Sequence, residues 1–164
     1  MIQGIFLVFG IFMLDVSLAQ EVFFGKVSFV SDGDTLWVLP EAVRKPRKLR
    51  IDGIDAPEIC QSGGADARDV LAAYVLNRRV EVTVWRYDDY GRGLARLVLD
   101  KKDLGAQMVS TGHAWSYRWG SSLGPYSSQE VFARQARLGL FASHKPELPR
   151  DFRKRHGPCH SPMP

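Results

Sequence analysis

Several motifs that mark large enzyme classes are missing from this chain of 164 residues. No glycine-rich loop precedes an expected helix, which argues against a P-loop protein, and no nucleophile elbow is present, which argues against an α/β-hydrolase. The chain also lacks internal repeats and long linkers, and its length suits one domain with a single core. Other residues must therefore carry any chemistry.

Cysteine is scarce, since only Cys60 and Cys159 occur in the whole chain. In an exported protein the two could form a disulfide, which would hold the C-terminal tail near Glu58. Two unpaired thiols are the alternative, because the geometry that decides between them is not given by a sequence. The compact tract around His156 and His160 is an unfavourable transition-metal site because its spacing is short and its segment is rich in proline.

Lysine and arginine are missing from the N-terminus, where Met1–Leu14 is almost wholly apolar. The run is shorter than the ~20 residues of a membrane span, and Ser17 and Ala19 are spaced like a cleavage site. We therefore predict that residues 1–19 are a secretory signal peptide and that the protein is secreted or periplasmic. An uncleaved membrane anchor is the alternative, because signal peptides usually begin with a basic residue.

The bulk composition is that of a globular protein. Hydrophobic residues make up 45% of the chain and charged residues 24%, which argues against disorder. The formal net charge of +4 suits a polyanionic partner.

Patterns along the chain predict the α+β class. Alternating β-branched and apolar residues predict five strands, at residues 22–30, 35–39, 49–54, 79–85 and 94–99. Helical periodicity and capping residues predict helices at 65–77, from Asp103 to about 110, and from a capping box at Ser127 to 139. We predict one domain over residues 20–144, followed by an irregular, basic, proline-rich tail over 145–164.

Acids and arginines in the first two thirds of the chain form the strongest chemical pattern. Asp34 occurs in Asp-Gly-Asp-Thr, Arg50, Asp55 and Glu58 in Arg-x4-Asp-x-Pro-Glu, and Arg92 in Tyr-Gly-Arg-Gly. Two carboxylates can hold a hard cation, a third can position or deprotonate a water, and two guanidinium groups can clamp a phosphate. The set is equipped for metal-assisted phosphodiester cleavage, with turn capping and surface ion pairing as the alternative.

In this order and spacing, the motifs resemble the staphylococcal nuclease family over residues 25–142, where Gly112-His113-Ala114 and the segment 136–141 also fit. The resemblance implies an OB-fold barrel of five strands with about three helices. It implies a Ca²⁺ site formed by Asp34, Asp55 and the carbonyl of Ala56, and catalytic roles for Arg50, Glu58 and Arg92. It also implies endonucleolytic cleavage of DNA and RNA with little sequence preference, leaving 3′-phosphates.

Three further residues are candidate substrate contacts. Tyr90 and Tyr117 could stack on bases, and Lys48 could contact a phosphate. Packing of the two rings and a solvated turn at Lys48 are the alternatives.

Three other functions compete with a free nuclease that acts as a monomer. The first is a non-catalytic OB-fold module that binds nucleic acid, and the second is a membrane-tethered surface nuclease. The third is a structural or interaction protein whose acids bind Ca²⁺ only for stability.

Overall fold

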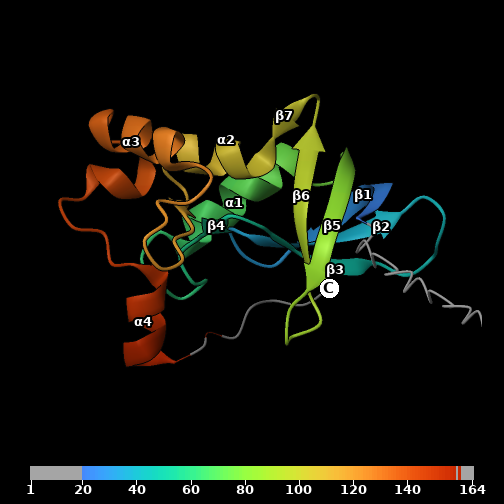
Figure 1. The fold of residues 1–164 in the computed structure, drawn as a ribbon, viewed down its shortest axis with the longest axis horizontal. Coiled ribbons are helices and arrows are strands. Elements are labelled where there is room, and N and C mark those ends of the chain that lie inside the picture. Colours follow the sequence, from blue (N-terminus) through green and yellow to red (C-terminus); the bar gives the residue numbers. More distant parts are fainter. Residues whose placement is uncertain (1–19, 158, 160–164) are drawn as a thin grey trace, which may run out of the picture.

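The computed structural model describes residues 20–157 and 159 (Figure 1), so the predicted signal peptide over 1–19 lies outside the described residues. The described part of the chain contains short and long strands, four α-helices and one 3-10 helix. In chain order these elements are β1 Glu21–Val30, β2 Thr35–Pro40, β3 Arg47–Ile51, β4 Ile54–Asp55, α1 Gly64–Val75, β5 Arg79–Tyr87, β6 Gly93–Leu99, β7 Lys102–Asp103, α2 Leu104–Ser110, β8 Trp115–Ser116, α3 Ser127–Gln135, η1 Gly139–Ala142 and α4 Pro149–His156.

Five strands close into a barrel. Antiparallel neighbours run in the order β3-β2-β1-β5-β6, and a parallel pairing of β3 with β6 joins the two ends, with Leu49 opposite Gly93 and Ile51 opposite Ala95. Short strand β7 extends the sheet beside β6, and β4 pairs separately with β8. The structure therefore confirms the predicted α+β class and the five-stranded OB-fold barrel.

The core fills the barrel and the space beneath α1. In β5, the alternating residues Val80, Val82 and Val84 are buried, as the period of two predicts. Leu71 of α1 and Leu49 of β3 are fully buried in the same cluster. Each such aliphatic side chain contributes roughly 1.5–3 kcal/mol through removal from water, so the barrel is a firm support for residues at its rim.

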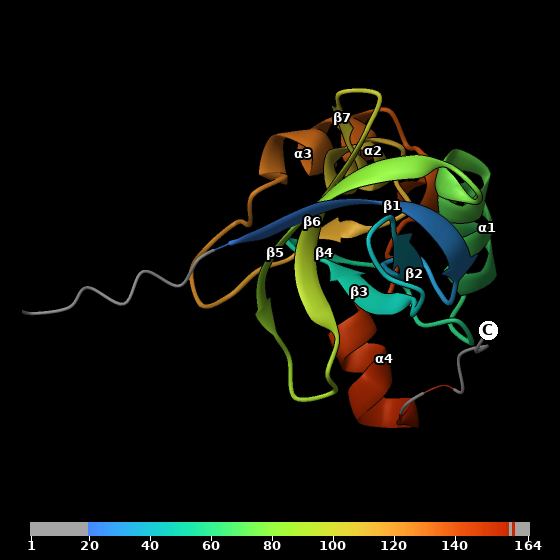
Figure 2. The same cartoon turned by 90° about the vertical axis from the view of Figure 1, so that its right-hand side faces the viewer.

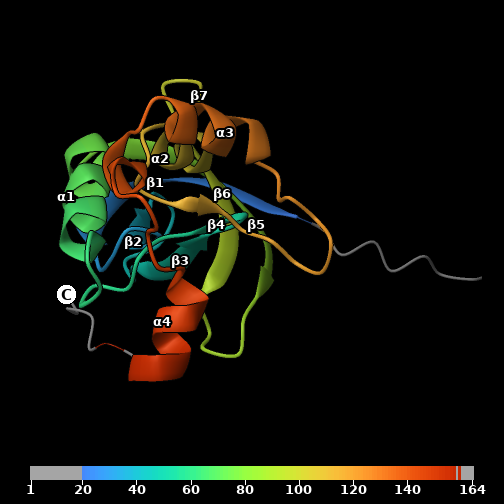
Figure 3. The ribbon, with the colours of Figure 1, turned by 90° about the vertical axis from the view of Figure 1, so that its left-hand side faces the viewer.

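The helices lie on different sides of this barrel. Figures 2 and 3 show α2 and α3 together on one side, α1 against another, and α4 on the side opposite to α2 and α3. Among the described residues, no helix has the length and apolar character needed to cross a membrane.

The strand predicted over 49–54 is wrong in its C-terminal half. Strand β3 ends at Ile51, and the chain then turns through Asp52 and Gly53, whose φ of 78° lies in the left-handed region that favours glycine. After the turn, β4 pairs with β8 through Ile54 and Asp55. The turn brings Asp55 back toward β3, which a continuous strand would not do.

The prediction of an irregular tail is also wrong, because α4 occupies Pro149–His156. Proline suits the first turn of a helix, where its missing N–H would have no intrahelical partner. The last turn carries Arg153, Lys154 and Arg155, whose charges are favourable at a helix C-terminus. Phe152 is buried, so the helix has an apolar anchor that its basic composition conceals.

Of the two predicted helix caps, one is present. Asp103 caps α2, because its side chain accepts a hydrogen bond from the N–H of Ala106 at 3.0 Å. The capping box at Ser127 is wrong, since α3 has Tyr126 at its N-cap without a side-chain cap. Glu130, the expected partner in that box, is instead buried and accepts hydrogen bonds from the N–H of Ser116 and from Arg118.

Candidate active site

One cleft of about 560 Å³ collects nearly all the residues that the sequence singles out. The predicted site residues that line it are Asp34, Lys48, Arg50, Ala56, Glu58, Tyr90, Arg92 and Tyr117. Asp55 does not line the cleft but is hydrogen-bonded to Arg50, which does. Residues more than 80 positions apart in the sequence therefore meet at one place on the barrel.

Sheet register explains why the first acid and the first arginine are neighbours. Arg50 lies opposite Thr35 in the β2–β3 pairing, and Asp34 immediately precedes Thr35 in the turn after β1. The N–H of Ile51 donates to the carbonyl of Asp34 at 2.8 Å, which fixes the backbone of that turn against β3. The position of the Asp34 carboxylate is thus set by the barrel and not by a free loop.

Arg50 bridges the two buried acids. Its Nη1 donates to Asp34 Oδ1 at 3.0 Å and its Nη2 donates to Asp55 Oδ1 at 3.0 Å. Asp34 and Asp55 are only 3% and 7% exposed, and Asp34 also accepts from the N–H of Ala56 at 3.2 Å. These neighbours hold the two carboxylates in fixed directions beside the cleft.

Negative charge exceeds positive charge at this centre. Burial and the Asp34 carboxylate raise the pKa of Asp32 to about 7, although its Oδ1 accepts a hydrogen bond from the N–H of Asp34. Burial and Asp34 also raise the pKa of Asp55, with Arg50 and Arg153 acting in the opposite direction. Burial opposes the charge of Arg50, but the surrounding carboxylates raise its pKa above the ordinary value. The carboxylates would be ionised more readily beside a further cation.

The donor set fits a hard divalent cation. Asp34 and Asp55 supply buried carboxylate oxygens, Asp32 adds a third, partly buried carboxylate nearby, and Ala56 lines the same cleft. Calcium binds such oxygen ligands and accepts irregular geometry. The raised pKa of Asp55 gives the same indication, because a bound cation would favour its charged form.

Arg92 is held by the loop between β5 and β6. Asp88 accepts from the N–H of Arg92 at 2.9 Å and from its Nε at 2.8 Å, and it also accepts from the N–H of Tyr90 at 3.0 Å. Partial burial opposes the charge of Asp88, but these bonds lower its pKa below the ordinary range. The Arg92 guanidinium lies 5.2 Å from the centre of the Tyr90 ring, so the loop presents a cation and an aromatic face together.

The three predicted substrate contacts all line the cleft, but they differ in exposure. Tyr90 is 83% exposed and Tyr117 is 40% exposed, so both side chains are accessible to solvent. The Lys48 ammonium lies 5.9 Å from the centre of the ring of Trp37, the residue opposite Lys48 in the β2–β3 pairing. The accessibility of both rings is compatible with base stacking, and their role remains a prediction.

Arg153 of α4 is a site residue that the sequence analysis missed. Its Nη1 donates to Glu58 Oε1 at 2.6 Å and to Asp55 Oδ1 at 3.3 Å. The indirect signal in the sequence is its pair of cysteines. In the structure, Cys60 and Cys159 form a disulfide with a Cα–Cα distance of 5.9 Å. Of the two alternatives for the cysteines, the bridge is therefore the one present, and it brings the tail to the site.

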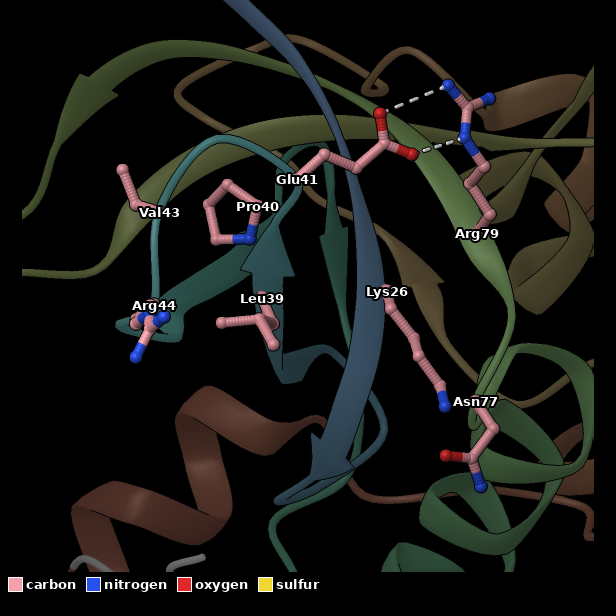
Figure 4. Close-up of a pocket in the computed structure, with 8 residues that line it drawn as sticks. All are labelled: Lys26, Leu39, Pro40, Glu41, Val43, Arg44, Asn77 and Arg79. Atoms are coloured by element: carbon pink, nitrogen blue, oxygen red, sulfur yellow. Dashed lines mark hydrogen bonds and ion pairs between the residues drawn. The ribbon is translucent and has the colours of Figure 1, made fainter.

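A second hollow, of about 470 Å³, lies elsewhere on the barrel and contains none of the predicted site residues. Figure 4 shows that one of its two arginines, Arg79, is held by Glu41, and the Nε–Oε1 distance is 2.6 Å. Its lining includes Leu39, Pro40 and Val43. Lys26 and Arg44 add two further cations, but Glu41 is the one carboxylate among the described lining residues, so this hollow has no pair of acids that could hold a metal ion.

The barrel and its cleft define a class of OB-fold protein with buried carboxylates and arginines at the rim. A sequence profile described as "Staphylococcal nuclease homologue" matches residues 48–143. A micrococcal nuclease of Shigella flexneri is 34% identical over 145 residues, which cover 80% of this chain and 81% of that protein. An uncharacterized endonuclease of Haemophilus influenzae is 33% identical over 129 residues, covering 79% of this chain and 72% of that protein.

These matches show that the chain belongs to the staphylococcal nuclease family. A probable staphylococcal-like nuclease of Oryza sativa subsp. japonica is also similar, at 31% identity over 114 residues. That match covers 70% of this chain but only 31% of the plant protein, so the chain spans about a third of that relative.

Proposed function

We propose that this protein is a Ca²⁺-dependent endonuclease that hydrolyses phosphodiester bonds of DNA and RNA. The observation that carries the proposal is the meeting of five residues in one place, where Arg50 joins Asp34 to Asp55 and both Glu58 and Arg92 line the same cleft. Membership of a nuclease family supports the same reaction class.

Glu58 is the residue that we assign to the attacking water. Its carboxylate lines the cleft, and its side chain is 22% exposed, so water can reach it. A carboxylate in this position orients the water and accepts its proton as the oxygen attacks phosphorus. The bond from phosphorus to the 5′ oxygen then breaks, which leaves a 3′-phosphate and a 5′-hydroxyl.

Arg50 and Arg92 are assigned to the phosphate. Attack on phosphorus concentrates negative charge on the non-bridging oxygens, and guanidinium groups fixed in advance stabilise that charge without reorganisation. Their fixed positions come from Asp34 and Asp55 in one case and from Asp88 in the other. Lysine, a point charge on a flexible stem, would not reproduce the planar fork.

Asp34, Asp55 and the Ala56 carbonyl would hold the calcium ion. When bound, Ca²⁺ supplies positive charge that polarises the phosphate and favours an ionised Asp55. The protein's own part is to keep these oxygens buried and aligned, which the bonds from Arg50 and from the N–H of Ala56 achieve.

Low sequence specificity follows from what faces the substrate. Lys48, Arg86 and Arg92 line the cleft and suit backbone phosphates, which carry no base sequence. Tyr90 and Tyr117 offer faces on which any base can stack. We therefore propose little discrimination among bases and a monomer that needs no partner chain for cleavage.

We also propose that the protein is secreted or periplasmic. The apolar run of Met1–Leu14 and the residues before position 20 support a signal peptide. The Cys60–Cys159 disulfide supports an oxidising compartment, since such bonds persist mainly outside the cytosol.

The test is cleavage of labelled single-stranded DNA, double-stranded DNA and RNA by the full-length chain, with Ca²⁺ and with a chelator. Glu58→Gln is compared with Glu41→Gln, which removes the same charge at an exposed ion pair outside the cleft. We expect Ca²⁺-dependent cleavage that collapses only in Glu58→Gln, with 3′-phosphate ends. Tight nucleic-acid binding without cleavage under any divalent ion would contradict the proposal and leave the non-catalytic OB-fold module.

A further inference from the structure

The C-terminal segment that follows the family-matched residues 48–143 reaches back to the turn that carries Glu58. Three links join the segment to that turn. Gln61 Nε2 donates to the carbonyl of Glu147 at 2.7 Å, Cys60 is bonded to Cys159, and Arg153 is paired with Glu58. The turn comprises residues 58–61, and the C-terminal segment contacts three of these four residues. These contacts constrain the turn more than its own backbone hydrogen bonds would.

The turn itself is tight and leaves little room for adjustment. The N–H of Gln61 donates to the carbonyl of Glu58 at 2.8 Å, and the N–H of Glu58 donates to Gln61 Oε1 at 3.1 Å. A Cβ on Gly64, at the start of α1, would collide with the Glu58 carbonyl. The backbone of Glu58 is therefore fixed, but none of these contacts involves its carboxylate.

Arg153 supplies that missing contact. Its Nη1 is 2.6 Å from Glu58 Oε1, and it is the sole hydrogen-bonding partner of this carboxylate within residues 20–157 and 159. The same guanidinium lies farther from Asp55, at 3.3 and 3.4 Å. The short bond of Arg153 is therefore to Glu58, the residue assigned to the attacking water. Its longer bonds are to Asp55, which Arg50 already contacts.

The helix that carries Arg153 is anchored on both sides of it. Leu148 packs against the cluster of Trp115, Ala133 and Phe141, and Phe152 is 6% exposed. The disulfide follows six residues after Arg153 and joins the chain two residues after Glu58. The apolar contacts and the covalent bond thus set the distance between the two charged groups.

We propose that Arg153 is a positioning residue for Glu58, and that the disulfide-linked helix α4 completes the site of this family member. The proposal rests on the function assigned above, in which Glu58 orients and deprotonates water. Arg153 holds one carboxylate oxygen, so the other is directed toward the cleft in a narrow range of orientations. Because a water misplaced by about 1 Å can slow a reaction on the order of 100-fold, this restriction acts on the chemical step.

The test measures kcat and KM for single-stranded DNA at saturating Ca²⁺, and the cleavage rate again at limiting Ca²⁺, using full-length wild type, Arg153→Gln and Arg153→Lys. We expect Arg153→Gln to lower kcat by on the order of 10- to 100-fold with little change in KM. Arg153→Lys should recover part of the loss, because it restores a cation without the planar fork. The matched control is Lys154→Gln, which removes the same charge from the next, exposed residue of α4.

A second variant tests the tether independently of the charge. Cys60→Ser/Cys159→Ser should lower kcat in the same direction, and adding Arg153→Gln to it should have less effect than in the bridged protein, because both changes act through Glu58. Thermal melting of each variant, and calorimetric Ca²⁺ titration, separate this effect from unfolding or metal loss. Arg153→Gln should retain Ca²⁺ binding and a native melting transition.

Four results would overturn the inference. An unchanged kcat in Arg153→Gln would show that Glu58 needs no such partner. A faster variant at limiting Ca²⁺ would make Arg153 an internal cation that competes with the metal, and a higher KM alone would make it a substrate contact. A wild type that does not cleave at all would overturn the proposed function, and this inference with it.

Discussion

At the scale of single residues, the site depends on charges that hold one another in place. Arg50 contacts two acids that are almost fully buried, while Asp88 fixes both the backbone and the side chain of Arg92. Arg50 uses its two terminal nitrogens on different acids, Nη1 on Asp34 and Nη2 on Asp55. Arg92 directs Nε and Nη2 to Asp88 Oδ2. The arginines are thereby oriented before any substrate arrives.

Replacement of Arg92 by lysine should therefore slow the reaction without unfolding the protein. We expect kcat/KM to fall by on the order of 100-fold or more, by analogy with the loss of one preorganised donor to the transition state. Steady-state kinetics and a melting curve measure the two effects separately. Arg79→Lys, an exposed arginine paired with Glu41, is the control and should behave as wild type.

A second prediction at this scale concerns pH and His113. Burial lowers the pKa of His113, with the charge of Asp66 opposing the shift, so the folded state takes up a proton less readily than the unfolded chain. The associated stability is present above the ordinary histidine pKa of about 6.5 and is lost as the pH falls through the lower folded value. Urea unfolding should show a smaller loss of stability between about pH 7 and pH 5 in His113→Gln than in wild type. An equal loss in both proteins would contradict this account.

At the scale of secondary-structure elements, α3 is fixed by one buried acid. Glu130 is 1% exposed, accepts a hydrogen bond from the N–H of Ser116 in β8 at 3.0 Å, and pairs with Arg118 and Arg134. The strand β8 in turn pairs with β4, which carries Asp55. A buried charge thus links α3 to the site through two short strands.

Glu130→Ala should be strongly destabilising. Its removal leaves the buried N–H of Ser116 without an acceptor, which costs about 1–3 kcal/mol, and also takes the partner from two partly exposed arginines. Chemical denaturation should detect the change, with Gln135→Ala at the exposed end of α3 as a control. A loss below about 1 kcal/mol would mean that the pairs contribute little, as surface ion pairs do.

The elements also show what a sequence can and cannot predict here. Strand β5 and helix α2 were predictable because alternation and a cap at Asp103 are local signals. Helix α4 was not, because its buried residues are only Pro149 and Phe152, within an otherwise basic segment. The sequence pattern around Glu130 is that of a capping box. In the structure, β8 lies beside this residue, and the Glu130 carboxylate accepts a hydrogen bond from the N–H of Ser116 instead.

At the site, too, the residues in local motifs could be predicted and those placed by long-range contacts could not. Asp34, Arg50, Glu58 and Arg92 could be predicted because they occur in ordered motifs, and the structure brings them to one cleft. Arg153 lies 95 residues from Glu58 and in no such motif. Its position depends on a disulfide whose formation a sequence leaves open.

At the scale of the whole molecule, stability and metal binding should be linked. Burial, and repulsion from Asp34, raise the pKa of both Asp32 and Asp55, so these carboxylates carry their charge at a cost that a bound cation would reduce. A ligand that binds only the folded state stabilises it, by about 2.7 kcal/mol at a concentration one hundred times its dissociation constant.

Calcium should accordingly raise the melting temperature by on the order of 5–10 °C, and a chelator should reverse the shift. Differential scanning fluorimetry of the full-length chain measures this effect. The shift should be absent in Asp55→Asn and retained in Asp69→Asn, an exposed acid paired with Arg68 on α1. A full shift in Asp55→Asn would place the calcium elsewhere.

The most direct test of the proposed reaction is the opening of a covalently closed, circular single-stranded DNA during a Ca²⁺ titration. A circular substrate has no ends, so only endonucleolytic hydrolysis converts it to a linear product. We expect opening by wild type to rise with Ca²⁺, to stop with a chelator and to fall by on the order of 100-fold or more in Glu58→Gln. An intact circle at every Ca²⁺ concentration, or equal rates for wild type and Glu58→Gln, would contradict it.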